Sequence, residues 1–145
     1  MPYFALVSNC RNSARLPVRA DAGSAGYDFF LPEDVVLQPG DVKLVFTDVK
    51  ACMTQDEVLL LTIRSSLAKK GIFLANAPGV VDSSYYNNPS NEGNIGLLLY
   101  NSNSSTVRLW AGERIAQGIF IRYLTVANDR VLSDKRTGGY GSSGR

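Results

Sequence analysis

Arg64, Ser65 and Ser66 stand where an apolar run ends and a segment of good helix formers begins. A guanidinium beside two hydroxyls and the backbone N–H groups of a helix start suits an anion such as phosphate. A capping serine with a surface arginine explains the same residues equally well. On its own, this segment therefore leaves both an anion site and a structural role open.

A second segment brings a carboxylate to the end of a short apolar run. Asn76 precedes a Pro-Gly turn, and Gly79-Val80-Val81 leads from that turn into Asp82. A hydroxyl-rich stretch that contains Tyr85 follows directly. Because an aspartate just beyond such a turn also forms Asx turns, the segment is compatible with chemistry and with a plain loop.

Two further segments combine glycine with polar side chains. Asp28 follows Gly26, where the simplest interpretation is an exposed aspartate at the entry of a strand. Gln117 ends the segment Gly112–Gln117, which is typical of a turn that leads into an amphipathic strand.

The C-terminal segment 136–145 is rich in glycine and serine, as flexible linkers are. It nevertheless contains Arg136 and Tyr140-Gly141. An arginine suits contact with a phosphate, and an aromatic ring suits stacking on a nucleobase.

The chain has 145 residues and no histidine. This excludes Ser-His-Asp and Cys-His nucleophilic catalysis and His-ligated zinc, so any proton transfer must use carboxylates, lysine, tyrosine or water. The charges, 15 Lys+Arg against 13 Asp+Glu, are scattered and predict no nucleic-acid partner. No apolar run reaches the length of a membrane span, so we expect no membrane partner and a cytoplasmic protein.

Strand signals dominate the pattern, and they are bounded by Gly, Pro, Asn, Asp and Ser. One helix is predicted over Ser66–Gly71, with a serine start and a terminating glycine. Strands without crossover helices predict an all-β sandwich or barrel. We expect one domain over 1–135 and a flexible arm over 136–145. The predicted strands are Val42–Phe46, Val58–Ile63, Ile95–Tyr100, Thr106–Trp110 and Ile115–Val126.

In their order and spacing, the five segments resemble the five motifs of the trimeric dUTPase family, from about Ala22 to Ser143. The resemblance implies a distorted jelly roll of the β-clip type with one short helix and a glycine-rich C-terminal arm. It implies a homotrimer with active sites at subunit interfaces. It also implies Mg²⁺-assisted hydrolysis of dUTP to dUMP and pyrophosphate, which limits uracil in DNA and supplies dUMP for dTMP synthesis.

The resemblance assigns Asp82 as the general base for the water that attacks the α-phosphorus. Asn76 and the backbone of Gly79–Val81 would read the uracil edge. Tyr85 would stack beneath the deoxyribose and exclude a 2′-hydroxyl.

The same resemblance gives the phosphate chain its ligands. Ser65, Ser66 and Gln117 would bind it, while Arg64 and Asp28 order the site, with Asp28 near the water shell of the metal. No direct protein ligand to Mg²⁺ is expected, since triphosphate oxygens and waters would hold the ion. In the arm, Arg136 would clamp the γ-phosphate and Tyr140, next to Gly141, would cover the uracil.

One stretch departs from the family pattern. After Asp82 the family usually continues x-Asp-Tyr-Arg-Gly-Glu, whereas here Ser84 and Tyr86 replace the Asp and the Arg, and an Asn-rich loop follows over 86–94. Similar loops occur in dUTPases of Gram-positive bacteria and their phages. The role of the loop and the trimer contacts near it stay open.

Three alternatives compete with this interpretation. The related dCTP deaminases carry a glutamate on the strand after the third motif, but Ile95–Tyr100 holds no acid. A regulatory protein partner is expected if the chain is phage-encoded, with loop 86–94 as the candidate epitope. A catalytically dead jelly roll does not fit the intact set of Asp82, Ser65, Gln117 and Arg136.

Overall fold

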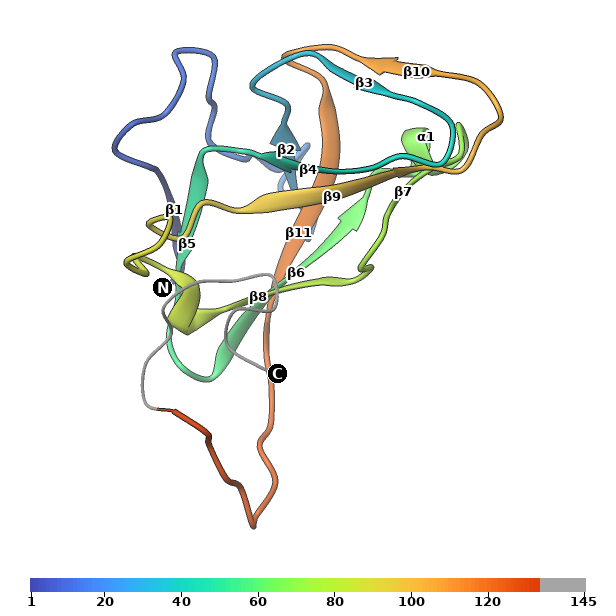
Figure 1. Cartoon of the computed structure of the whole chain (residues 1–145). Coiled ribbons are helices and arrows are strands. Elements are labelled where there is room, and N and C mark those ends of the chain that lie inside the picture. Colours follow the sequence, from blue (N-terminus) through green and yellow to red (C-terminus); the bar gives the residue numbers. More distant parts are fainter. Residues whose placement is uncertain (134–145) are drawn as a thin grey trace.

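Antiparallel strands account for nearly all the regular secondary structure of residues 1–133, the part of the chain that this computed structural model describes (Figure 1). The same part contains one α-helical turn and one 3-10 turn. In chain order the elements are β1 (Tyr3–Leu6), β2 (Tyr27–Phe30), β3 (Val35–Leu37), β4 (Val42–Phe46), β5 (Val49–Cys52), β6 (Glu57–Ile63), α1 (Ser65–Ala68), β7 (Ile72–Leu74), β8 (Gly79–Asp82), η1 (Ser83–Tyr85), β9 (Gly96–Asn101), β10 (Val107–Leu109) and β11 (Arg114–Arg122).

Within residues 1–133 the strands form four antiparallel sheets. The largest has the order β2-β11-β6-β8, and the next has the order β4-β9-β7. The two remaining sheets are the pairs β1-β5 and β3-β10. Most partners are distant in sequence, as in β2 with β11 and β3 with β10. This arrangement is a distorted jelly roll, which confirms the predicted all-β class.

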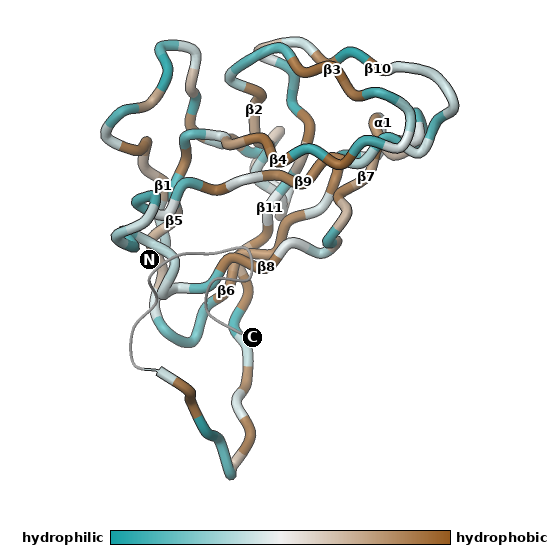
Figure 2. Tube along the Cα trace, viewed as in Figure 1, coloured by the Kyte–Doolittle hydropathy of each residue, from teal (hydrophilic) through white to brown (hydrophobic). Residues whose placement is uncertain are grey.

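One cluster of buried apolar side chains joins the two larger sheets. Phe29, Leu59 and Ile115 come from the first sheet, and Leu97 and Leu99 come from the second, all with exposed fractions of 1% or less. Figure 2 shows the corresponding hydrophobic stretches along the strands, with hydrophilic residues concentrated in the loops. Burial of each such side chain contributes roughly 1.5–3 kcal/mol, so this cluster provides the main stabilisation of the fold.

Two predicted boundaries were wrong for identifiable reasons. β11 ends at Arg122 instead of Val126, because its partner β6 begins at Glu57 and the ladder stops where Arg122 faces Glu57. The helix spans Ser65–Ala68 and its N-cap is Arg64, without a side-chain cap, so Ser66 does not start it. The expected terminating glycine is confirmed, since Gly71 has φ +78°.

No helix within residues 1–133 has the length and apolar character needed to cross a membrane.

The Asn-rich loop 86–94 is fastened to the body by its own polar side chains. Asn88 is 4% exposed and its side chain bonds the loop backbone at three points, at Tyr85, Ser90 and Asn91. Glu92 accepts hydrogen bonds from the Ser8 hydroxyl and from Lys50 Nζ, each at 2.6 Å. The loop is therefore folded, and polar contacts hold it against the sheet β1-β5.

Tyr86, which stands where the resembled family has arginine, also contacts the sheet β1-β5. Its ring lies edge-on to Tyr3, with centroids 6.2 Å apart, and Lys50 Nζ lies 5.0 Å from its ring centre. The departure from the family pattern thus places an aromatic contact between the loop and the sheet β1-β5.

We expect Glu92→Gln to lower the melting temperature at pH 7 and to lose this effect in acid. The ammonium of Lys50, and after it Ser8, lowers the pKa of Glu92 from 4.5 to about 2. Because the folded-state pKa is the lower one, the stabilisation is complete above pH 4.5 and disappears as the pH falls towards 2. Thermal melts of both proteins between pH 7 and pH 2.5 measure the difference.

Glu33→Gln is the matched control, since Glu33 is half exposed in its ion pair with Arg11. Its effect on the melting temperature should be small at every pH. A gap between wild type and Glu92→Gln that stays constant with pH would contradict the assignment.

Candidate active site

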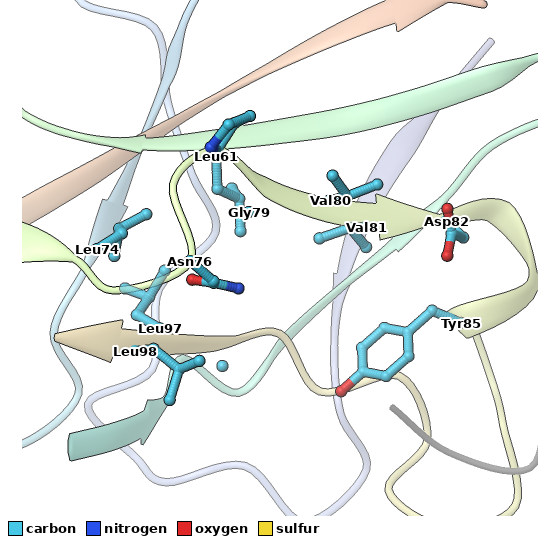
Figure 3. A pocket seen from close by; sticks show the side chains of 12 residues that line it. Leu61, Leu74, Asn76, Gly79, Val80, Val81, Asp82, Tyr85, Leu97 and Leu98 are labelled. Atoms are coloured by element: carbon cyan, nitrogen blue, oxygen red, sulfur yellow. The ribbon is translucent and has the colours of Figure 1, made fainter. Parts of the chain in front are cut away.

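A pocket of about 340 Å³ opens between β8 and β9. Figure 3 shows Asn76, Val80 and Asp82 along one side of it and the ring of Tyr85 below. The structure thus brings together Asn76, Gly79–Val81, Asp82 and Tyr85, the residues of the first 133 that were predicted for uracil, sugar and base catalysis. The complete lining is Leu61, Leu74, Asn76, Pro78, Gly79, Val80, Val81, Asp82, Tyr85, Gly96, Leu97 and Leu98.

Strand alternation explains how β8 presents these groups. Gly79 and Val81 face the core, while Val80 is 58% exposed and Asp82 lies on the same side as Val80. Gly79 pairs with Leu61, and a Cβ at Gly79 would lie 3.2 Å from the Leu61 Cβ, so a small residue suits this contact. The strand therefore ends with its carboxylate at the margin of the pocket.

β8 is also an edge strand of its sheet. It pairs with β6 on one side, and no other strand of residues 1–133 pairs with its second side. Such an edge presents backbone N–H and C=O groups in an alternating row. Since Gly79–Val81 line the pocket, this row is available to a planar ligand that carries both donors and acceptors.

A second group of predicted residues surrounds Asp28. The Asp28 carboxylate is 8% exposed and lies 3.2 Å from Arg114 Nη1 and 3.5 Å from Arg64 Nε. Arg64 also donates to the backbone carbonyl of Arg114 at 3.2 Å. The simple expectation of an exposed aspartate was therefore wrong, because two arginines enclose it.

Gln117 lies beside Asp28 on the neighbouring strand, as its register partner. Its side chain packs over Gly26, where a Cβ would come within 2.5 Å of the Gln117 Oε1. Glycine at position 26 therefore leaves the space that Gln117 occupies. Ser65 and Ser66 follow Arg64 at the start of α1 and are exposed, so they belong to this second group.

Sequence analysis missed Arg114 as a site residue. The register of β11 against β2 shifts between Arg114 and Ala116, so Arg114 is the register partner of Phe30 and lies on the same side of the sheet as Asp28. Without that bulge, residues two apart on a strand would point the same way, and Arg114 would point into the core with Ala116. The only sequence signal for Arg114 is its place inside the segment Gly112–Gln117.

The two groups occupy opposite corners of one sheet face. Asp82 aligns with Val58 on β6 and thus with Ile121 on β11, whereas Asp28 aligns with Gln117. Three strand spacings and four residues along β11 separate the two aspartates, which amounts to roughly 20 Å. One chain therefore does not bring Asp82 together with the predicted phosphate ligands.

Arg136, Tyr140 and Gly141 lie outside the described residues.

Comparison with known proteins identifies the family. The dUTPase family model matches residues 12–144. The deoxyuridine 5′-triphosphate nucleotidohydrolase of Lactococcus lactis subsp. lactis (strain IL1403) is 41% identical over 144 residues, which covers 97% of this chain and 96% of that protein. The chain belongs to the dUTPase family, and this membership decides against the deaminase alternative.

Solved structures agree with this assignment. The dUTPase from Streptococcus mutans matches with a TM-score of 0.81 and 44% identity, over 86% of this chain and 98% of that one. The dUTPase of Staphylococcus bacteriophage 80alpha, solved with dUpNHpp, matches with a TM-score of 0.74 and 26% identity, over 100% and 99% of the two chains. The phage protein comes from work on phage dUTPases that control transfer of virulence genes.

Asp28→Asn should lower the free energy of unfolding by about 1.5–3 kcal/mol, the usual range for hydrogen bonds to a charged group. The substitution keeps the shape but leaves Arg64 and Arg114 facing each other without a counter-charge. Urea unfolding measures the loss. Asp56→Asn is the control, because Asp56 and its partner Arg122 are exposed, and its effect should be about 0.5 kcal/mol or less. Equal effects of the two substitutions would contradict a special role for the Asp28 cluster.

Proposed function

We propose that this protein hydrolyses dUTP to dUMP and pyrophosphate with the assistance of Mg²⁺, and that Asp82 is the general base. The observation that carries the proposal is the position of Asp82, at the end of the edge strand that forms one wall of the pocket. In the cytoplasm, such an activity limits uracil in DNA and supplies dUMP for dTMP synthesis.

Uracil fits the chemistry of the pocket. Its N3–H donor lies between two carbonyl acceptors, and the edge of β8 that pairs with no second strand of residues 1–133 offers the alternating backbone groups that this pattern needs. Asn76 adds an amide with both a donor and an acceptor at the same pocket. Cytosine reverses the pattern at N3 and C4, so it would leave buried groups without partners and be rejected.

The reaction needs one proton acceptor and many positioning groups. Asp82 takes a proton from water while the water oxygen bonds to the α-phosphorus. The bond from the α-phosphorus to its bridging oxygen breaks, and pyrophosphate leaves. Ser65, Ser66 and Gln117 bind the phosphate chain, and Arg64 is held in place by Asp28. Phosphoryl transfer depends mainly on positioning and charge stabilisation, so a chain without histidine suffices.

Magnesium enters this scheme with the substrate. No group of three or more His, Cys, Asp or Glu side chains within residues 1–133 is arranged to hold a metal ion. Triphosphate oxygens and waters suit Mg²⁺, which dehydrates reluctantly, and Asp28 would accept hydrogen bonds from that water shell. When bound, Mg²⁺ would neutralise charge on the triphosphate.

We further propose that the active form is a homotrimer with its sites between subunits. Asp82 and the phosphate ligands of one chain lie roughly 20 Å apart, so a complete site takes them from different subunits. The outer face of the sheet β4-β9-β7 is apolar. On this face Val42 and Phe73 both pair with Tyr100, and their side chains are 53% and 39% exposed. Large exposed apolar surfaces of this kind mark interfaces.

The segment after β11 supports the same proposal. Leu124 and Leu132 are 96% and 97% exposed, and Figure 1 shows this part of the chain extending away from the body. Such residues gain burial when the segment lies on another subunit. Arg136, Tyr140 and Gly141 would then close over the nucleotide as a lid that excludes water.

Asp82→Asn should reduce dUTP turnover by at least about a hundredfold, as expected for loss of a general base, while dUTP affinity changes little. Pyrophosphate release from dUTP and from the four ordinary dNTPs tests the base and the substrate together. Calorimetry with a non-hydrolysable dUTP analogue measures the affinity.

Retained turnover in Asp82→Asn would show that another group is the base. Equal pyrophosphate release from all five nucleotides, or ammonia from dCTP, would contradict a uracil-specific pyrophosphohydrolase.

Val42→Asp should dissociate the trimer and abolish most turnover, because it buries a charge in the proposed interface. Analytical ultracentrifugation and dUTP turnover at the same protein concentration measure both effects. Leu16→Asp is the control, since Leu16 is similarly exposed at 46% but lies outside this face. A monomeric Val42→Asp variant with full turnover would show that one chain carries a complete site.

A further inference from the structure

Tyr85 has two different environments at its two ends. Its ring lines the pocket, yet the residue is only 5% exposed (Figure 3). Its hydroxyl donates to the backbone carbonyl of Asn94 at 2.6 Å. The same hydroxyl accepts a hydrogen bond from Asn91 Nδ2 at 2.8 Å. Both partners come from the loop 86–94.

A hydroxyl anchored in this way fixes the direction of the whole ring. The tyrosine oxygen lies on the axis of the second side-chain torsion, so holding it sets the first torsion, which decides where the ring lies. Without the anchor, the ring is free to tilt within its rotamer well. The two hydrogen bonds therefore determine the shape of the pocket floor.

Asn91 is oriented for this contact by the rest of the loop. Its Oδ1 accepts from Asn88 Nδ2 at 2.8 Å and from the Gly93 backbone N–H at 3.0 Å. Since two donors face the oxygen, the amide cannot flip, and Nδ2 is left to donate to Tyr85. These contacts therefore fix the direction in which Asn91 Nδ2 donates. An asparagine without such contacts would have no fixed direction.

The loop itself cannot relax easily. Gly93 has φ +88°, and a Cβ there would lie 2.7 Å from the Tyr85 carbonyl oxygen. Asn94 accepts from the Asp48 backbone N–H at 2.8 Å and donates to the Asp48 carboxylate at 3.1 Å. Arg11 holds that carboxylate at 2.9 Å. A continuous set of hydrogen bonds therefore runs from Arg11 to the pocket.

We infer that Asn91 is a positioning residue that holds the ring of Tyr85 against the sugar of the bound nucleotide, and that it thereby sets selectivity for deoxyribose over ribose. The inference rests on the proposed function, in which Tyr85 excludes a 2′-hydroxyl. It gives loop 86–94, which departs from the family pattern, a defined part in substrate choice.

The test compares kcat/KM for dUTP and UTP in wild type, Asn91→Ala, Tyr85→Phe and the double variant. Asn91→Ala should lower the dUTP/UTP ratio about fivefold, the equivalent of one ordinary hydrogen bond. Tyr85→Phe should lower it similarly. Because Asn91 acts through the tyrosine hydroxyl, its substitution should add nothing in the Tyr85→Phe background.

Asn103→Ala is the matched control, since Asn103 Nδ2 donates to the Lys70 carbonyl, outside the pocket. It should lower the melting temperature and leave the dUTP/UTP ratio unchanged. An Asn91→Ala variant that loses stability but keeps the wild-type ratio would overturn the inference. Additive effects of Asn91→Ala and Tyr85→Phe would overturn it as well.

The ring NMR resonances of Tyr85, assigned by their absence in Tyr85→Phe, report the positioning independently of turnover. They should shift or broaden in Asn91→Ala and stay in place in Asn103→Ala. Unchanged Tyr85 resonances in Asn91→Ala would overturn the inference even if wild type proved inactive towards dUTP. A wild-type protein without dUTP turnover would contradict the proposed function. An active wild-type protein whose dUTP/UTP ratio is unaltered in Asn91→Ala would contradict the role of Asn91 alone.

Discussion

The seven-residue strand β6 is the constraint on which both halves of the site depend. On one side it pairs with β8 and sets the position of Asp82, and on the other it pairs with β11 and sets that of Gln117. Its last residue is followed directly by Arg64, so a single strand determines where the proposed base, the pocket and the predicted phosphate ligands lie. Strands do not stretch, and the distance between the two corners is therefore built into the hydrogen-bonded register. The other elements of the chain support this sheet. In the proposed trimer, a second subunit would bring the two corners of the site together.

Support for the sheet is polar at the two places where chemistry is expected. Beneath the phosphate ligands, Asp28 offsets the charge of Arg64 and Arg114, so both guanidinium groups keep defined positions without bound substrate. Beside the pocket, the Asn91 amide and the Asn94 backbone carbonyl hold the hydroxyl of Tyr85. Charged and amide hydrogen bonds hold side chains in direction as well as in place, which apolar packing does less well. Binding then needs little rearrangement, and more of its energy remains for the reaction.

Much of this could be predicted from the sequence where the signal is local. β4, β6 and β9 are apolar runs of five to seven residues, and Asn76, Asp82 and Tyr85 meet at one pocket because they follow one another along the chain. The remaining features depend on distant partners. β3 has three residues and is defined by pairing with β10, some seventy positions later, where Leu37 faces Val107. Arg114 reaches Asp28 only through a bulge, and the composition of an asparagine-rich loop gives no sign that one of its amides holds a tyrosine. Such contacts arise from tertiary geometry, which local propensity does not encode.

The separation built into β6 also links assembly to ligand binding. In one chain, the pocket with the proposed base Asp82 lies at one corner of the sheet and the predicted phosphate ligands lie at the other, so under the proposed function a nucleoside triphosphate uses both only where two chains meet. Any ligand that bridges subunits binds the assembled form more tightly than the separate chains, so it must stabilise the assembly by the same free energy. In the proposed trimer, the apolar face of β4-β9-β7 would provide association without the ligand, and the triphosphate would add contacts that exist only in the assembled site. If the proposed trimer is the active form, the geometry of the sheet itself confines activity to the associated state.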